Sequence, residues 1–320
     1  VSVQSSNDYK SILDKTINKF TVPLAGGADG LDVTEQNPFR NTGLTDGTAN
    51  TNYAYNSIKE AVDMTRDTEF FEYNLLACPG ITNENLTYHL IQTAESRADA
   101  LAVIDLKGDF VPADEDNSGV TYPNLSQTIT NLKDRAINSS YGCAYFPFVQ
   151  VRDPSSSTLV YMPSSVVALG AMAYTDRVRA PWFAPAGFNR GGLSSGIAGL
   201  PVVNVTKKLT AQDRDDLYKA NINPIASFPN EGIVIFGQKT LQVTRSALDR
   251  INVRRLMLFV KKGISQIAST MLFEPNETTT TPDLIDRNVL YAKVFLKPTR
   301  AIEFVAIDFV ISNTGAAFED

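Results

Sequence analysis

The residue types that most often carry out catalysis are scarce in this sequence. Its single histidine, His89, lies in LTYHLIQ beside apolar residues, which favours a structural or surface role. The two cysteines, Cys78 and Cys143, lie in the apolar stretches LLACPG and GCAYFPF, and we expect free thiols rather than a disulfide. Two separated cysteines and one histidine cannot form a zinc site, so we predict no metal and no cofactor.

One short motif matches a catalytic pattern. Gly192–Gly196 (GLSSG) has the G-x-S-x-G form of a hydrolase nucleophile elbow, with Ser194 as the nucleophile. The elbow needs a strand before the serine and a helix after it, whereas a glycine-rich loop precedes Ser194 and IAGLPVV follows it. The hydrolase chain order also needs a histidine after the serine, and His89 precedes it. We interpret the match as fortuitous, with a triad that uses His89 in another chain order as the alternative.

Two loops resemble ligand-binding motifs but lack essential residues. Asp114–Gly119 (DEDNSG) begins like a calcium-binding EF-hand loop, but Leu125 occupies the twelfth position, where a bidentate glutamate is needed. The stretch AGGADG at residues 25–30 lacks the lysine and hydroxyl residue of a phosphate-binding loop. We interpret the first as an acidic surface loop, with weak cation binding as the alternative, and the second as a turn.

Charge is distributed unevenly along this acidic chain. The formal net charge of -6 and the isoelectric point of about 5.0 argue against a general nucleic-acid-binding protein. Residues 245–262 are the exception, with six bases against one acid, Asp249. This stretch is either a solvated helix face or an electrostatic docking surface for an acidic protein partner. The bases are Arg245, Arg250, Arg254, Arg255, Lys261 and Lys262.

Hydrophobic patterning predicts alternating strands and helices over much of the chain. The clearest unit is a strand, a Cys-Pro-Gly turn, an amphipathic helix and the apolar strand ALAVIDL, which together form a βαβ unit with a parallel sheet. This alternation is typical of a three-layer α/β domain. We expect strands at residues 70–77, 100–106, 143–151, 159–162 and 232–236, and helices at residues 57–65, 82–96, 125–137 and from Pro163 onward. Val167, Gly170, Ala171 and Tyr174 form a narrow face of that last helix, suited to close packing on a sheet.

A second part follows the loop-like residues 186–201, where we expect a domain boundary. Thr210 and Asp213 form a capping-box pattern that opens a helix. Asn252 is expected to cap the longest helix, Val253–Leu272. Apolar residues at helical spacing form a stripe along that helix: Val253, Leu256, Met257, Val260, Ile264, Ile267, Ala268 and Met271.

The two ends of the sequence give further expectations. Nine of the eleven residues of Ala301–Ile311 are apolar, so both faces of the expected strand are hydrophobic. Such a strand is either buried in its own sheet or donated to a neighbouring chain. The start, VSVQSSNDYK, has neither an initiator methionine nor the regions of a signal peptide, and we expect a boundary within a longer protein. No apolar run reaches the roughly 18 residues that span a bilayer.

A series of segments follows the order of one known family. In the first half they are LAGGADG, NLLACPG, ESRADALAVIDL, AYFPFVQVRDP and VYMPSSVVALGAMAYTDRVRAPWFAPAGFNRGGL. In the second half they are ANINPIASFPNEGIVIFGQKTLQ, SALDRINVRRLMLFVKKGI, MLFEPN and VFLKPTRAIEFVAIDFVISNTG. Together these segments resemble the tail sheath proteins of contractile-tailed bacteriophages, over most of residues 22–320. Each motif is modest alone, and the series is highly specific.

The resemblance implies an α/β plus α+β fold. A three-layer α/β sheath domain, likened to subtilisin in topology but without its triad, is followed by a C-terminal α+β domain with an extended terminal strand. The implied divisions are an N-terminal remnant of an arm or linker at residues 1–20, the sheath domain at residues 21–200, and the C-terminal domain at residues 201–320. Residues 301–320 are the C-terminal arm.

The resemblance also assigns two sets of contact residues. It favours donation of the terminal strand to a neighbouring subunit through Ile302, Phe304, Val305, Ile307, Phe309 and Ile311. It also implies that the C-terminal domain faces a tail tube. We assign the tube contact to basic residues of the helix expected at Val253–Leu272. The residues assigned to that contact are Arg254, Arg255, Lys261 and Lys262.

The implied function is structural, not enzymatic. Copies of the chain would polymerise helically around a tail tube and contract to drive the tube through a host envelope. The implied partners are further copies, the tail tube protein, and the baseplate and tail terminator proteins, with no nucleic acid and no membrane integration. The expected location is the virion tail, assembled in the host cytoplasm. The alternatives are the sheath of a related contractile injection device or bacteriocin and, distantly, a serine hydrolase using Ser194.

The sequence departs from the family pattern at one internal position. Sheath subunits carry a further segment after the FEPN motif, whereas here Asn276 runs directly into Glu277-Thr-Thr-Thr-Thr.

Overall fold

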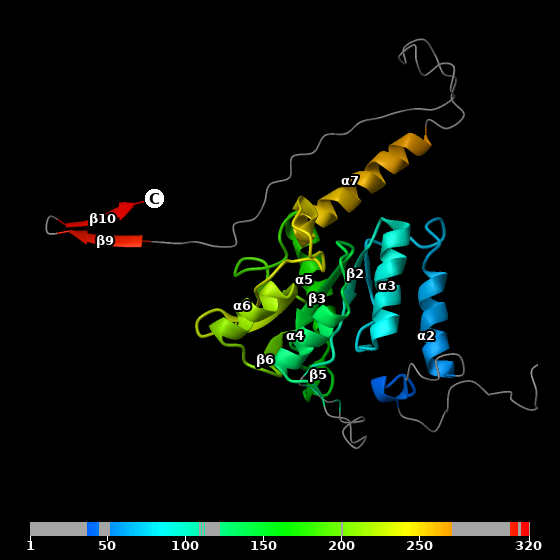
Figure 1. Cartoon of the computed structure of the whole chain (residues 1–320), viewed down its shortest axis with the longest axis horizontal. Helices are drawn as coiled ribbons and strands as arrows, with labels where there is room; N and C mark the ends of the chain where they lie inside the picture. Colours follow the sequence, from blue (N-terminus) through cyan, green and yellow to red (C-terminus); the bar gives the residue numbers. More distant parts are fainter. Residues whose placement is uncertain are drawn as a thin grey trace, which may run out of the picture. The chain divides into compact units, whose positions relative to one another are not determined.

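The computed structural model describes residues 37–44, 52–108, 110, 112, 122–199, 201–270, 308–312 and 315–319. The chain divides into two units, Val1–Pro38 and Phe39–Asp320, and every helix and strand described below belongs to the second (Figure 1). No helix in these ranges is long and apolar enough to cross a membrane.

A five-stranded sheet forms the centre of the second unit. Its strands, in order across the sheet, are β1 (Leu75–Ala77), β2 (Leu101–Ile104), β3 (Gly142–Phe146), β7 (Ile222–Phe228) and β8 (Gly232–Ile235). The first four are parallel, and β8 is antiparallel to β7. Every residue of β2 and β3 is buried, as expected for parallel strands that are covered on both faces.

Three helices cover one face of this sheet. They are α3 (Glu84–Arg97), α4 (Leu125–Asp134) and α6 (Ala211–Lys219), and α2 (Tyr53–Met64) in turn contacts α3. Their apolar residues form one core cluster with Ile104 of β2 and Phe146 of β3. The side chains of Asn52, Asn83, Asn124 and Thr210 cap the four helices by accepting backbone N–H groups. The capping box predicted at Thr210 and Asp213 is confirmed.

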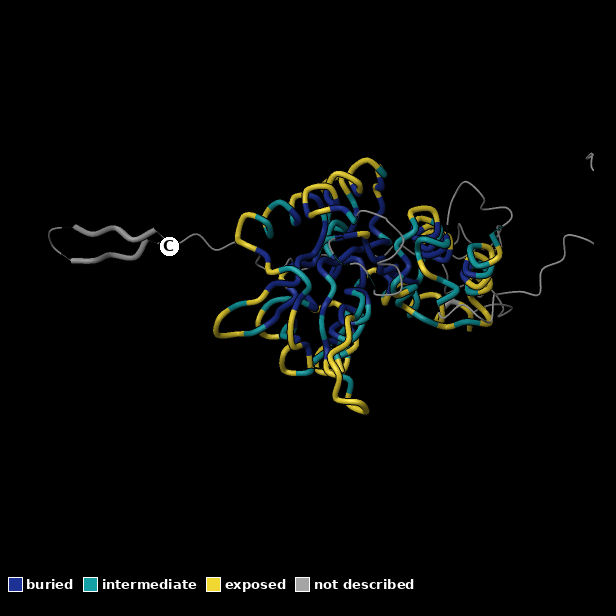
Figure 2. The backbone as a smooth tube through the Cα atoms, turned by 90° about the horizontal axis from the view of Figure 1, so that it is seen from below, coloured by how far each residue is buried: buried dark blue, intermediate teal, exposed yellow. Residues whose placement is uncertain are grey.

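The opposite face carries two further helices and a small antiparallel sheet. The helices are α5 (Ser164–Val178) and α7 (Ile251–Ser269), and the sheet has the order β5 (Leu159–Met162), β4 (Val149–Arg152), β6 (Val202–Val205). Val103 and Tyr145 point to this side and pack with Met172 of α5, because successive strand residues face opposite sides. Figure 2 shows the buried residues gathered inside this body. The α/β class is therefore confirmed.

Two predicted strands are shorter than their apolar patterns suggested. The strand expected at residues 70–77 is reduced to β1, and the Phe70 side chain is 77% exposed. The cause is the buried Arg97 guanidinium, which holds residues 65–71 in a loop by donating to three of their carbonyl oxygens. The strand expected at residues 143–151 is two strands, β3 and β4. The chain changes sheets at Pro147, which has no N–H group for a ladder.

Two helix details also differ from expectation. The longest helix, α7, begins at Ile251, so Asn252 lies in its first turn and is not its cap. In α5, Gly170 does not pack on the sheet. A Cβ atom at this position would lie 2.4 Å from the carbonyl oxygen of Ala198, so Gly170 allows a loop to approach the helix closely.

The loop at residues 186–199 belongs to the same folded body as the sheet. The outer edge of β8 is occupied by this loop: Gly187 and Leu193 donate to the carbonyl oxygens of Ile235 and Ile233, and Ile235 donates to the carbonyl oxygen of Gly191. Strand β7, beyond the loop, pairs with β3. The domain division expected at residues 200 and 201 therefore runs through one sheet, because β7 and β8 complete the sheet that β1 begins.

The four remaining elements of the described residues are short or separate. Two 3-10 helices, η1 (Asn41–Gly43) and η4 (Ala247–Asp249), lie in connecting segments. Near the C-terminus, β9 (Asp308–Ser312) and β10 (Gly315–Glu319) form an antiparallel hairpin.

Candidate interaction surfaces

A buried carboxylate, Asp105, is the most concentrated polar feature of the described residues. It follows β2 directly and is 1% exposed. Its oxygens accept the N–H groups of Gly80 (3.0 Å) and Ser165 (2.9 Å) and the hydroxyls of Ser164 (3.0 Å) and Ser165 (2.6 Å). Burial raises the pKa of Asp105, and the four hydrogen bonds partly offset that rise. This carboxylate joins the turn after β1 to the first turn of α5. It bonds no histidine and has the geometry of a structural clamp.

Ser194 is not placed as a nucleophile. Its hydroxyl oxygen accepts the N–H of Ile233 at 2.8 Å, so this side chain completes the covering of the β8 edge. His89 is occupied elsewhere: its Nε2 atom lies 2.9 Å from a carboxylate oxygen of Asp63 on α2. No catalytic dyad links these two residues, and the match to the elbow is a sequence coincidence.

The thiols and acidic groups show no further reactive centre in the described ranges. Cys78 and Cys143 are both free, as predicted, and burial raises the pKa of each thiol. Within the part of the chain that the structure covers, no three histidine, cysteine, aspartate or glutamate side chains cluster as metal ligands would. The acidic loop at residues 114–119 and the glycine-rich stretch at residues 25–30 both lie outside the described residues.

The basic residues of α7 divide into a buried pair and an outer pair. Arg254 and Arg255 are 7% and 3% exposed. Arg255 pairs with Asp176 of α5 at 2.6 Å, while Arg254 contacts Ser140 and stacks over the Tyr141 ring. These two arginines fasten α7 to the body and do not face outward. The expectation of a four-residue basic surface therefore fails for them, because their charges are turned inward.

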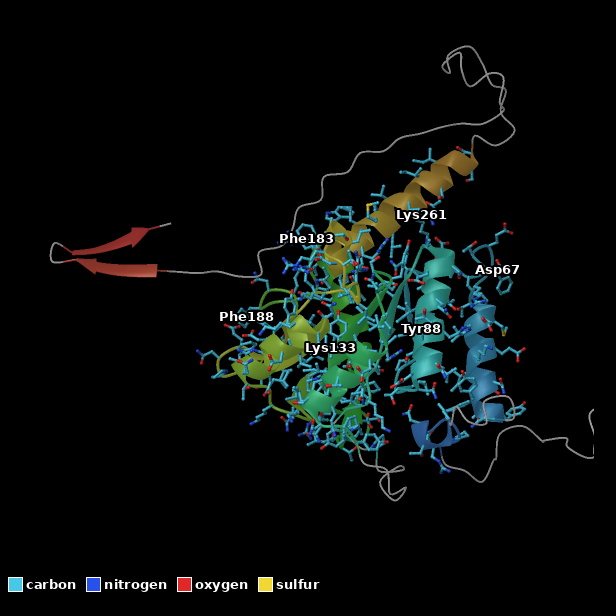
Figure 3. The ribbon with its side chains drawn as sticks, viewed as in Figure 1. Asp67, Tyr88, Lys133, Phe183, Phe188 and Lys261 are labelled. Carbon is cyan, nitrogen blue, oxygen red and sulfur yellow. The ribbon has the colours of Figure 1, made fainter. Side chains whose placement is uncertain are left out.

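The outer pair of α7 also makes contacts within the chain. Lys262 pairs with Glu72 at 2.7 Å, and Lys261 donates to the carbonyl oxygen of Ala98 at 3.1 Å. Lys261 remains exposed (Figure 3).

The predicted apolar stripe of α7 is buried only at its start. Val253 is 2% exposed, whereas Met257 is 37%, Ile264 is 39% and Ile267 is 64% exposed. From Phe259 to the end of α7, no described side chain is buried. Phe259 packs against Trp182, whereas Ile264 and Ile267 further along the helix remain exposed.

The C-terminal hairpin contains two of the six residues assigned to subunit contact. Phe309 and Ile311 lie in β9 and pair with Phe318 and Ala316 of β10. The other four, Ile302, Phe304, Val305 and Ile307, lie outside the described residues.

Comparison with known proteins identifies the family. Residues 49–241 match the model of the phage tail sheath protein central domain, which is more than half of the chain. The chain belongs to the phage tail sheath family.

Individual sheath proteins extend this match. The chain is 32% identical, over 68% of its length, to the tail sheath protein of Vibrio phage KVP40, and 26% identical over its whole length to that of Enterobacteria phage T4. It spans only 35% and 55% of those two relatives. The predicted resemblance to tail sheath proteins is confirmed.

Solved structures share the fold at lower identity. The chain superposes on a chain of the anti-feeding prophage baseplate with a TM-score of 0.58 and 20% identity, covering 80% of this chain and 72% of that one. It also superposes on the sheath complex of an extracellular contractile injection system in its contracted state, with a TM-score of 0.55 and 19% identity, covering 76% and 72%. Both likenesses concern the fold.

Proposed function

We propose that this chain acts as a structural subunit of a contractile tail sheath. Copies polymerise helically around a tail tube, and their contraction drives the tube through the host envelope. The observation that supports this most is the match of residues 49–241 to the sheath central domain, together with relatives that are themselves tail sheath proteins. The proposal makes surfaces, not pockets, the functional parts of the molecule.

The physical requirement for such a tube is a contact between two different surfaces of identical copies. A heterologous contact that does not close into a ring generates an open helical array. Contraction is then a re-packing of nearly rigid bodies across those contacts. The tightly packed sheet between two helix layers is suited to movement as a rigid body, because close-packed interiors deform little.

Within this proposal, the C-terminal segment is an arm that a neighbour's sheet receives. Antiparallel pairing of β9 with β10 supports the idea, because an isolated two-stranded hairpin is at best marginally stable in water. Addition to a further strand would satisfy its outer backbone groups. The arm residues are those of the sequence prediction: Ile302, Phe304, Val305, Ile307, Phe309 and Ile311.

Contact with the tube is assigned to the outer lysines of α7. Arg254 and Arg255 are withdrawn from the predicted set because they are buried. Lys261 and Lys262 remain as its members. A charge contact of this kind sets register and encounter rate more than affinity.

We further propose a revised domain layout. The likeness to subtilisin and a C-terminal α+β part remain in it. The pairing of β7 with β3 and the burial of Ile251 and Leu258 in the same core favour keeping β7, β8 and the start of α7 with the sheath domain. Residues 1–20 stay an arm or linker and residues 301–320 an arm. The proposed further partners are the baseplate and tail terminator proteins. The proposed location is the virion tail, with assembly in the host cytoplasm.

A second candidate is the sheath of a contractile injection device. The fold likeness to the anti-feeding prophage and to the extracellular injection system favours it. The subunit physics would be the same, and the particle that carries the chain would decide between the two.

Electron microscopy of the purified protein, alone and with its tail tube, tests the proposal. We expect helical tubes from the wild type and none from a variant that lacks residues 301–320, whose cooperative thermal unfolding serves as the folding control. Tubes of normal length from that deletion would refute the role of the arm. A wild type that stays monomeric at high concentration with its tube present would refute the sheath function.

A further inference from the structure

One surface of the body is basic and aromatic. Residues 177–212 contain five bases and no acid, in a chain whose net charge is -6. We call the outer part of this stretch at the end of α5 the basic surface, and it consists of the exposed Arg177, Arg179, Trp182 and Phe183 and the half-buried Arg190. Trp182 is 40% and Phe183 39% exposed. An exposed aromatic pair beside uncompensated arginines is the composition typical of a protein-binding site.

The basic surface is rigidly built. Arg190 donates to the carbonyl oxygen of Ala184 at 2.8 Å and lies over the Phe183 ring at 5.5 Å. Trp182 packs edge-on against Phe259 of α7, with ring centroids 5.3 Å apart. Arg177 and Arg179 are exposed and have no ion-pair partner among the described residues. Two positive charges are therefore held beside rings that are already ordered, which lowers the entropic cost of binding.

A second surface has the opposite charge. Residues 60–72 contain five acids and one base, Arg66. Asp63 pairs with His89 and Arg66, and Glu72 pairs with Lys262, which leaves three acids without an ion pair in the described chain. We call this the acidic surface, and it consists of Glu60, Met64, Asp67, Glu69 and Phe70. Phe70 is 77% and Met64 64% exposed.

The acidic surface is also held in shape. Arg97, buried beneath it, donates to the carbonyl oxygens of Thr65 (2.7 Å), Asp67 (2.9 Å) and Phe71 (2.8 Å), and its guanidinium stacks over Tyr73. The Asp67 carboxylate accepts the N–H of Glu69 at 2.9 Å. The hydrogen bonds of Arg97 therefore hold the loop in a conformation that exposes Phe70, which does not contribute to the core.

The two surfaces lie apart on the body. Figure 3 shows Phe183 and Asp67 well apart, and α7 adjoins both surfaces: Trp182 packs on Phe259, and Glu72 pairs with Lys262. No ion pair joins the two surfaces among the described residues, so their charges remain available to another copy.

We propose that the basic surface of one copy binds the acidic surface of the next copy. This inference rests on the proposed sheath function, because that function is the reason why many copies of the chain meet. The charges are complementary, with Arg177 and Arg179 on one side and Glu60, Asp67 and Glu69 on the other. Phe70 and Met64 supply apolar area opposite Trp182 and Phe183. The contact is heterologous, so each added copy leaves one basic and one acidic surface open for further growth.

Charge-reversal variants of the full chain test this contact. The first, Arg177→Glu with Arg179→Glu, makes both surfaces acidic. The second, Glu60→Lys with Glu69→Lys, makes both basic. Each alone is expected to weaken self-association at least about tenfold, since like charges repel across the contact. An equimolar mixture is expected to restore association in alternating order, and 0.5 M salt is expected to weaken both the wild type and the mixture.

The controls separate this inference from the sheath function. Lys133→Glu with Lys219→Glu reverses two exposed charges outside both surfaces and should associate like the wild type. Thermal unfolding should be unchanged in all variants. The proposed contact would be wrong if the charge-reversal variants associated like the wild type, or if their mixture associated no better than either variant alone. In that case, tubes formed by the wild type would still support the sheath function. A mixture that associates when no variant or wild-type chain forms tubes supports the contact and refutes only the sheath function.

Discussion

The Asp105 clamp allows one prediction to be worked out closely. Replacement by asparagine keeps the size of the side chain but exchanges one acceptor oxygen for an NH₂ donor. One carboxylate oxygen accepts the Gly80 N–H and the other accepts the Ser165 N–H. Whichever way the amide is turned, one of these backbone donors therefore faces another donor.

The expected cost follows from that unpaired donor. A buried donor left without an acceptor costs about 1–3 kcal/mol. For a body of this size, 1 kcal/mol corresponds to a change of about 2–4 °C in Tm. We expect Asp105→Asn to lower the free energy of unfolding by about 1–3 kcal/mol at pH 7, measured by urea and thermal unfolding followed by circular dichroism.

The difference in stability between the wild type and Asp105→Asn changes with pH in a defined direction. Burial raises the pKa of Asp105 in the folded chain above its value in the unfolded chain. The folded state then holds this proton to higher pH, so the stability of the wild type relative to Asp105→Asn falls as the pH rises through the raised pKa.

A matched control is the exposed Asp153, whose carboxylate likewise accepts serine hydroxyls and backbone N–H groups in a turn. Asp153→Asn should lose less stability at pH 7 than Asp105→Asn, because water can reach the serine and backbone donors around Asp153. If Asp105→Asn were as stable as Asp153→Asn, the clamp would have no energetic role and the reasoning from its four donors would be wrong.

Three other substitutions are predicted from the same contacts. Asp176→Ala should cost about 3–5 kcal/mol, because it leaves the Arg255 guanidinium buried without its counter-ion; the double variant Asp176→Leu with Arg255→Met should recover most of that loss in urea unfolding. Gly170→Ala should lower Tm although alanine favours helices by about 1 kcal/mol, since its Cβ would meet the Ala198 carbonyl oxygen at 2.4 Å; an unchanged or higher Tm would contradict the close approach. Hydrogen bonds from Ser155 and Ser156 lower the pKa of Asp153 to about 2, so its contribution is present above the unfolded pKa and is lost as the pH falls towards 2. Asp153→Asn should remove that part of the acid-induced loss of stability in thermal scans between pH 4 and pH 2.

Much of the central fold could be predicted from local pattern. The apolar run at residues 100–106 indicated a strand buried on both faces, and Thr210 with Asp213 marked the start of α6. Both signals act over a few residues. The errors arose where distant residues decide. The hydrogen bonds from Arg97 hold residues 65–71 in a loop, so Phe70 is not part of β1. At Pro147 the chain leaves the central sheet and enters the small antiparallel sheet.

The contact residues were harder to predict for the same reason. The bases of residues 245–262 are spaced so that sequence alone could not separate inward from outward side chains, and Arg254 and Arg255 are turned inward by Asp176 and Tyr141. The five bases of residues 177–212 are spread over a long stretch without acids, so they form no dense cluster of charge in the sequence. Asp105 was visible as an aspartate directly after a buried strand. Its partners Ser164 and Ser165 lie 59 and 60 residues away.

The covered edge of β8 restricts the ways in which many copies of one chain can meet. Ile233 and Ile235 have their outward backbone groups occupied by residues 187–194 of the same chain. No foreign strand can extend the central sheet on that side, and the indiscriminate stacking to which bare strands are prone is prevented there. At this edge, contact between copies therefore depends on which side chains match, and main-chain pairing between copies is left to the proposed C-terminal arm.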